Sequence, residues 1–240
     1  MVYHNSAGSI IPVAKPDISP LEISYVQDAL TSTWIGPAGK YINEFRQQFA
    51  KLCQVEFAIP TSSGTTALHL ALLGVGVGPG DEVIVPSLTY VASVNAIIYC
   101  GATPVFVDVE PQSWSIDPTL VVTCITSRTK AILAVHLYGM PASMDVLREV
   151  ANQYGLWLIE DAAEAPLATY KGRPTGSLGD VAAFSFFGNK VLACGEGGAV
   201  TTRNAEVAER MELLRGQGMD SVRRYWFPVV GYNYRLTNMA

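Results

Sequence analysis

The segment TSSGTT at residues 61–66 has the composition of a loop that binds an anion at the start of a helix. Backbone N–H groups at a helix start have no partner within the helix, the helix dipole favours negative charge there, and hydroxyl side chains add donors. Ser63, Gly64 and Thr65 are therefore candidate phosphate ligands. An ordinary Ser/Thr cap is the alternative interpretation of the same residues.

Two further segments could act on a ligand held at this loop. Glu160 and Asp161 follow an apolar run, where a buried carboxylate needs a partner and could hold a cationic ring nitrogen. Lys190 follows the apolar, aromatic run FSFF, and a lysine in such surroundings can react with a carbonyl carbon. An exposed strand end and a lysine that extends into solvent are the alternatives. Together, a phosphate, a ring nitrogen and a reactive carbonyl describe pyridoxal phosphate.

Strand and helix patterns that alternate along the chain must position these segments. Most strand candidates are unbroken apolar runs, which are typical of strands covered on both faces. Strands are predicted at residues 57–60, 82–86, 104–107, 131–136, 156–160, 181–186 and 198–202. Helices are predicted at residues 20–31, 42–52, 64–74, 90–100, 117–125, 143–155 and 204–216, with Ser143 and Asn204 as caps. The pattern predicts an α/β fold with three layers and a doubly wound, mostly parallel seven-stranded sheet, which binds ligands at the carboxyl ends of its strands.

The composition argues against several other classes of protein. Charged residues make up only 15% of the chain and the net charge is −5, which gives no support for nucleic-acid binding. Neither a signal peptide nor an apolar run of the ~18 residues that span a membrane is found, so a cytoplasmic location without membrane contact is expected. The spacing of the cysteines and histidines predicts no metal site. The low share of charge suggests that a partner subunit covers part of the surface.

Longer motifs carry a resemblance to a known family. The sequence resembles the DegT/StrS group of nucleotide-sugar aminotransferases, from about residue 11 to the last residue. The segments that carry it are TSSGTTALHLAL, GDEVIVPSLTYVASVNA, VHLYG, IEDAAEA, FSFFGNK, GEGG and GYNYRLTN. The resemblance implies the large domain of the aspartate-aminotransferase fold and pyridoxal phosphate as the cofactor. STWIG and SLTYVASVNAI are most similar to the branch of the family that forms GDP-perosamine.

The resemblance also implies a role for each matching residue. Lys190 matches the lysine that bonds to the cofactor and moves the proton, and is thus the predicted catalytic residue. Asp161 matches the carboxylate at the pyridine nitrogen, and Glu164 matches a position near the ring hydroxyl. The remaining predicted cofactor ligands are Ser63, Gly64, Thr65 and Ser185 at the phosphate, Tyr90 stacked on the ring, and Asn233, which reaches the phosphate of a neighbouring subunit.

The resemblance implies a homodimer with shared active sites, and glutamate and a nucleotide-linked keto sugar as substrates. The amino group would pass from glutamate to C4 of a 4-keto-6-deoxy sugar, with GDP-4-keto-6-deoxymannose favoured, for O-antigen or related polysaccharide synthesis. A helical segment that packs on the large domain is expected at residues 1–55, and the cofactor-binding large domain at residues 56–240, with the family's small C-terminal domain absent.

Three other functions compete with this interpretation. A truncated, non-catalytic remnant or regulatory module that binds pyridoxal phosphate is the main alternative. A sugar dehydratase of the same family would have a histidine where this chain has Lys190. A nicotinamide dehydrogenase would need a dinucleotide-binding fingerprint, which the sequence lacks. The segments 166–167 and 191–194 depart from the family pattern near the predicted site.

Overall fold

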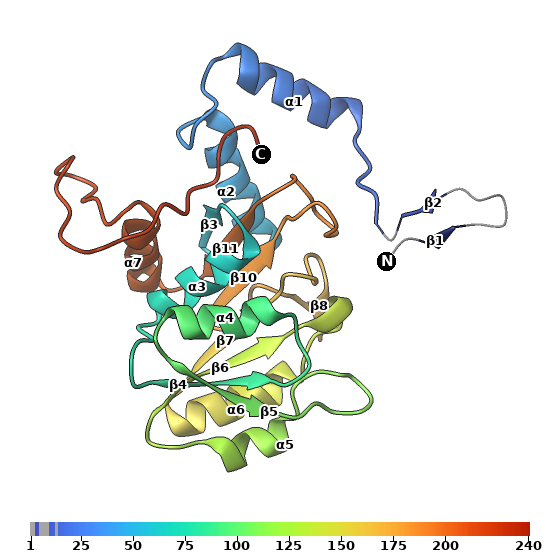
Figure 1. Ribbon diagram of the computed structural model, residues 1–240, viewed down its shortest axis with the longest axis vertical. Helices are drawn as coiled ribbons and strands as arrows, with labels where there is room; N and C mark the ends of the chain where they lie inside the picture. The colour runs from blue at the N-terminus through green and yellow to red at the C-terminus, as the bar shows by residue number, and fades with distance from the viewer. Residues whose placement is uncertain (1–2, 5–9, 13) are drawn as a thin grey trace.

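Seven strands lie side by side in the central sheet of the computed structural model, which describes residues 3–4, 10–12 and 14–240 (Figure 1). β11 pairs antiparallel with both of its neighbours, and the other pairs of this sheet are parallel. From edge to edge the strands are β3 (Phe57–Thr61), β11 (Gly198–Thr202), β10 (Val181–Ser185), β7 (Trp157–Asp161), β6 (Thr129–Val135), β4 (Glu82–Pro86) and β5 (Thr103–Val107). The predicted seven-stranded, mostly parallel sheet is confirmed.

Helices connect the strands, and those after the first cover the sheet. They are α1 (Pro20–Thr31), α2 (Lys40–Leu52), α3 (Gly64–Gly74), α4 (Val91–Tyr99), α5 (Pro118–Val121), α6 (Met144–Tyr154) and α7 (Ala205–Arg215), with 3-10 turns η1 (Val122–Cys124) and η2 (Leu137–Gly139). The predicted helix at residues 117–125 is wrong in length, because only one α-helical turn forms before η1. The β-branched residues of the TLVVT segment disfavour a longer helix.

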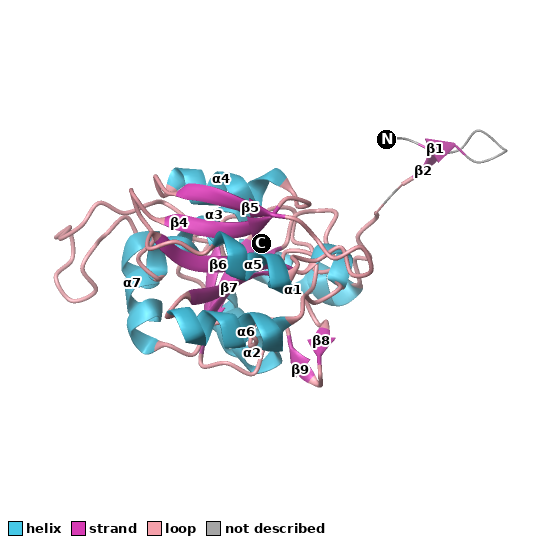
Figure 2. Ribbon diagram, turned by 90° about the horizontal axis from the view of Figure 1, so that it is seen from below, coloured by secondary structure: helices cyan, strands magenta, loops and turns pink. Residues whose placement is uncertain are grey.

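Two short ladders were missed by the sequence analysis. β1 (Tyr3–His4) pairs with β2 (Ile10–Ile11), and β8 (Thr169–Tyr170) pairs with β9 (Arg173–Pro174). The β8–β9 ladder lies at the margin of the molecule rather than within the sheet (Figure 2). Strands of two residues leave too short a pattern for alternation to reveal them.

The two predicted helix caps have different outcomes. Asn204 caps α7, with its side chain accepting a hydrogen bond from the N–H of Val207 at 3.1 Å. Ser143 is at the N-cap position of α6, but its side chain makes no capping hydrogen bond.

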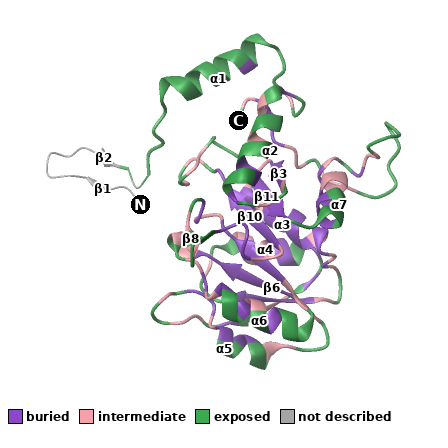
Figure 3. Cartoon of the chain, turned by 180° about the vertical axis from the view of Figure 1, so that it is seen from behind, coloured by how far each residue is buried: buried purple, intermediate pink, exposed green. Residues whose placement is uncertain are grey.

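Alternation along the strands builds a core on each face of the sheet. In β4, Val83 and Val85 pack in a cluster with α3, α4 and α7, whereas Ile84 packs in a second cluster with α5 and α6. Consecutive strand residues point to opposite faces, so a strand covered on both sides is apolar throughout. The buried strands contrast with the exposed outer faces of the helices (Figure 3).

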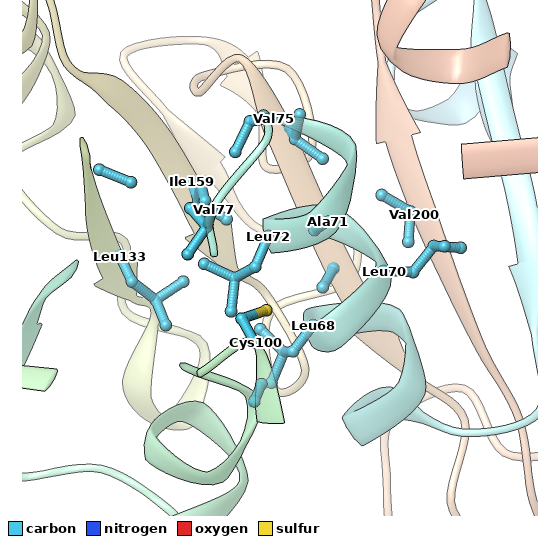
Figure 4. Close-up of a cluster of buried hydrophobic side chains, with 14 of the residues drawn as sticks. Leu68, Leu70, Ala71, Leu72, Val75, Val77, Cys100, Leu133, Ile159 and Val200 are labelled. Atoms are coloured by element: carbon cyan, nitrogen blue, oxygen red, sulfur yellow. The ribbon is translucent and has the colours of Figure 1, made fainter. Parts of the chain in front are cut away.

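α3 is the helix that fixes the position of the TSSGTT segment. It lies among the strands, α4 and α7, and Leu68, Leu70 and Leu72 are almost fully buried (Figure 4). A helix that is apolar on all sides can only be stable when it is surrounded. Its first turn is therefore held rigidly beside the ends of β3 and β10.

α1 differs from the other long helices, because Ala29 is its one buried residue (Figure 3). α2, by contrast, packs against β3 through Phe49 and Ala50. In the part of the chain that the structure describes, no helix is long and apolar enough to cross a membrane.

Candidate functional site

A cavity of about 340 Å³ opens at the carboxyl ends of the parallel strands, which is the size of a pocket for a small ligand. Eight of the nine predicted site residues line it: Ser63, Gly64, Thr65, Tyr90, Asp161, Glu164, Ser185 and Lys190. They come from the ends of β3, β4, β7 and β10, as the topology rule for such sheets requires. Asn233 does not line this cavity, and its side chain is exposed.

The start of α3 forms one wall of the cavity. Ser63 caps the helix by accepting from the N–H of Thr66 at 3.2 Å, and the Thr66 hydroxyl accepts from the N–H of Ser63 at 3.0 Å. The cap uses only the N–H of Thr66, so the N–H groups of Gly64 and Thr65 stay available for an anion. Among the described residues, no group accepts a hydrogen bond from the N–H of Gly64 or of Thr65.

Gly64 allows this helix start to approach the end of β10. A Cβ at position 64 would lie 2.6 Å from the Cβ of Ser185 and 2.9 Å from its Oγ. The Ser185 hydroxyl therefore lies close to the first residue of α3, and Gly64, Thr65 and Ser185 line the same cavity. Two N–H groups and a hydroxyl at one cavity can together form a phosphate cradle.

Asp161 contributes a buried carboxylate to the lining of the same cavity. The residue is 6% exposed, and burial raises the pKa of its carboxyl. Hydrogen bonds act against this rise: Ser93 Oγ donates to Oδ2 at 2.7 Å, and the N–H of Ala163 donates to Oδ1 at 3.2 Å. A buried carboxylate in this position can hold a cationic ring nitrogen.

Glu160 is the neighbouring carboxylate and has no access to the cavity. Burial raises the pKa of its carboxyl, but hydrogen bonds from His136 and from the backbone outweigh burial and lower it. His136 Nε2 lies 3.0 Å from Oε2, while the N–H groups of Gly176, Leu178 and Gly179 donate at 2.9, 2.8 and 2.7 Å. Because the N–H of Ala142 donates to His136 Nδ1, the ring is a neutral tautomer that donates from Nε2.

Lys190 and Glu164 form an ion pair at the cavity wall. Lys190 Nζ lies 3.0 Å from Glu164 Oε1, with 19% of the lysine side chain and 30% of the glutamate side chain exposed. Glu164 Oε2 accepts from the N–H of Tyr138 at 2.9 Å. The lysine is thus held at the site by a partner that is itself anchored.

Tyr90 stands at the mouth of the cavity, where it precedes α4 and is 72% exposed. An exposed aromatic ring in this place is available to cover a planar ligand.

Sequence reasoning missed His136, Thr89, Asn189 and Glu196, which also line the cavity. His136 could have been found, because it stands in VHLYG at the end of a predicted strand. Ser93 gave no such signal, because it lies within a helix and its contact with Asp161 spans 68 positions.

Comparison with known proteins places this geometry in a family. The model of the DegT/DnrJ/EryC1/StrS aminotransferase family matches residues 16–240. The GDP-perosamine synthase of Caulobacter vibrioides is 56% identical over 229 residues, which are 95% of this chain and 62% of that protein. The chain therefore spans about three fifths of the length of this curated relative.

Solved structures show the same fold. S. venezuelae DesV in complex with a ketimine intermediate has a TM-score of 0.87 and 47% identity, over 91% of this chain and 58% of that one. The PLP form of a putative sugar aminotransferase from Streptococcus pneumoniae has a TM-score of 0.90 and 33% identity, over 95% of this chain and 64% of that one.

The close approach at Gly64 predicts a large effect of one methyl group. Gly64→Ala should lower the free energy of unfolding by about 1–3 kcal/mol, because the new Cβ would overlap Ser185. Gly78→Ala is the control, since a Cβ there meets nothing within 4 Å and the change should stay within about 0.5 kcal/mol. Urea unfolding measures both. Equal effects of the two substitutions would contradict the steric argument.

Proposed function

The chain belongs to the DegT/DnrJ/EryC1/StrS aminotransferase family, and we propose that it carries the cofactor site of a pyridoxal-phosphate-dependent sugar aminotransferase. The observation that carries the proposal is the convergence of Lys190, Asp161 and the start of α3 on one cavity. Those three features supply a nucleophile, a partner for a ring nitrogen and a phosphate cradle. A solved relative in a PLP form supports the choice of cofactor.

The residues present fit this cofactor at both of its ends. The N–H groups of Gly64 and Thr65, with the hydroxyls of Ser63 and Ser185, would hold the phosphate. Asp161 would accept a hydrogen bond from the pyridine nitrogen and keep that nitrogen protonated. When bound, pyridoxal phosphate supplies an electron sink for the carbanion at the reacting carbon.

Lys190 carries the chemical step among the residues of this chain. Its Nζ would hold the cofactor through the aldehyde group and, when free, would take the proton from the α-carbon of the amino donor. Glu164 holds Nζ at the site before reaction, and its carboxylate would meet the ring hydroxyl, as the resemblance to the family implies. Tyr90 would lie on the ring and exclude water from one of its faces.

The proposed substrates follow from the relatives. Glutamate would donate the amino group and leave as 2-oxoglutarate, and the C4 ketone of a nucleotide-linked 4-keto-6-deoxy sugar would accept it. The identity to a GDP-perosamine synthase favours GDP-4-keto-6-deoxymannose.

A homodimer is the proposed assembly, with Asn233 of each chain reaching the phosphate of the other. The exposure of Asn233 outside its own cavity supports a role at a second copy.

The boundary near residue 55, between the helical segment and the large domain, also stays a prediction.

The proposed function leads to three predictions, of which the first concerns the covalent link. Borohydride reduction of the protein with pyridoxal phosphate should place a pyridoxyl group on Lys190, because no other lysine lines the cavity among the described residues. Peptide mapping locates the label. Lys190→Ala should abolish it, and Lys171→Ala, whose lysine pairs with Asp145 elsewhere, should not. Labelling of Lys171 in the parent chain would refute the assignment.

The second prediction concerns the substrate. With glutamate as donor, kcat/KM should be roughly tenfold or more higher for GDP-4-keto-6-deoxymannose than for the dTDP-linked sugar. A site whose polar groups pair with guanine would leave those groups without hydrogen bonds when thymine takes its place. Formation of the amino sugar measures the rate. A preference for the dTDP sugar would refute the proposed substrate, and a label on Lys190 without turnover of any sugar would favour the non-catalytic alternative.

The third prediction concerns the dimer. A mixture of Lys190→Ala and Asn233→Ala chains should regain turnover that neither variant shows, because a hybrid dimer holds one site with Lys190 and the partner's Asn233. A mixture of Lys190→Ala and Asp161→Ala chains is the control, since both residues line one cavity and no hybrid site is intact. Recovery in the control, or its absence in the first mixture, would contradict the role of Asn233.

A further inference from the structure

A chain of two hydroxyl groups leads from the cavity wall to the Asp161 carboxylate. Ser93 Oγ lies 2.7 Å from Asp161 Oδ2, and Thr89 Oγ1 lies 2.8 Å from Ser93 Oγ. Ser93 is fully buried and does not line the cavity, whereas Thr89 does.

The chemistry of the groups fixes the direction of both hydrogen bonds. An ionised carboxylate can only accept, so the single hydroxyl hydrogen of Ser93 is used on Asp161. Ser93 Oγ must then accept from Thr89, whose hydroxyl donates to it. Hydrogen bonds in such a chain strengthen one another, which makes Ser93 a better donor than an isolated serine.

The hydrogen bond from Ser93 opposes the effect of burial on the pKa of Asp161. Burial favours the neutral form of Asp161, and among the groups that act against burial Ser93 has the largest effect on the pKa. The N–H of Ala163 and the charge of Lys190 act in the same direction. A neutral Asp161 would not hold a protonated pyridine nitrogen.

The first turn of α4 also links this chain of hydroxyls to the mouth of the site. Thr89 and Tyr90 immediately precede the helix, and Ser93 lies in its first turn. The turn that places the Tyr90 ring over the cavity thus also places the donor to Asp161.

We propose that Ser93, oriented by Thr89, is a positioning residue that keeps Asp161 ionised and directed at the pyridine nitrogen of the cofactor. The inference rests on the proposed function and extends it to two residues that do not themselves react.

The test compares pyridoxal phosphate with its 1-deaza analogue, in which carbon replaces the ring nitrogen. Both retain the phosphate and the aldehyde, so only the nitrogen contact differs. Dissociation constants are measured for the full chain and its variants. Ser93→Ala should weaken the binding of pyridoxal phosphate by roughly tenfold, the effect of losing one charge-assisted hydrogen bond, and should leave the binding of the analogue unchanged.

Matched variants separate positioning from loss of structure. Ser115→Ala is the control, because Ser115 is also buried and its hydroxyl has no partner among the described residues. It should change neither dissociation constant. Thr89→Val should reduce the preference for pyridoxal phosphate, and Thr89→Ser should restore it, because serine keeps the donor. If Ser93→Ala does not fold, the comparison of Thr89→Val with Thr89→Ser tests the proposal in its place.

Equal weakening for both compounds, or no weakening for either, would overturn the proposal. Failure of the parent chain to bond either compound at Lys190 would refute the proposed function itself, which is a different outcome from the loss of selectivity.

Discussion

The burial of two adjacent carboxylates at the end of β7 is the constraint on which the rest of the site depends. A carboxylate without partners in the interior costs several kcal/mol, so each must be met by donors. Glu160 receives hydrogen bonds from His136 and from three backbone N–H groups, and Asp161 from Ser93 and Ala163. These contacts tie the end of β6, the first turn of α4 and the segment after β9 to one strand.

Strand geometry explains why the two acids do different things. Consecutive side chains of β7 point to opposite faces, so Glu160 meets the segment at residues 176–179, while Asp161 meets α4 and the cavity. Glu160 has its hydrogen-bonding capacity filled by the protein and is structural. Asp161 also lines the cavity, so it is the carboxylate of the two that can contact a ligand.

The sequence was sufficient to predict whatever depends on local pattern. Apolar runs predicted the seven strands within two residues at either end, and the rule for strand ends predicted where Gly64, Asp161 and Lys190 would meet. What it could not predict depends on contacts between distant residues. The partner of Asp161 lies 68 positions away within an ordinary helix, and nothing in the residues around Ser93 marks it as a donor.

The ion pair of Lys190 orders the side chain that the proposed reaction requires. Glu164 uses one oxygen for Lys190 and the other for the N–H of Tyr138, whose backbone lies in the left-handed region at φ 51°. A residue other than glycine in this region stores strain that the surrounding structure must hold. Because the Tyr138 contact does not involve the lysine, Glu164 would keep this contact if Nζ left it to form the proposed covalent bond. The turn at Tyr138 thus anchors the carboxylate independently of the lysine that it pairs with.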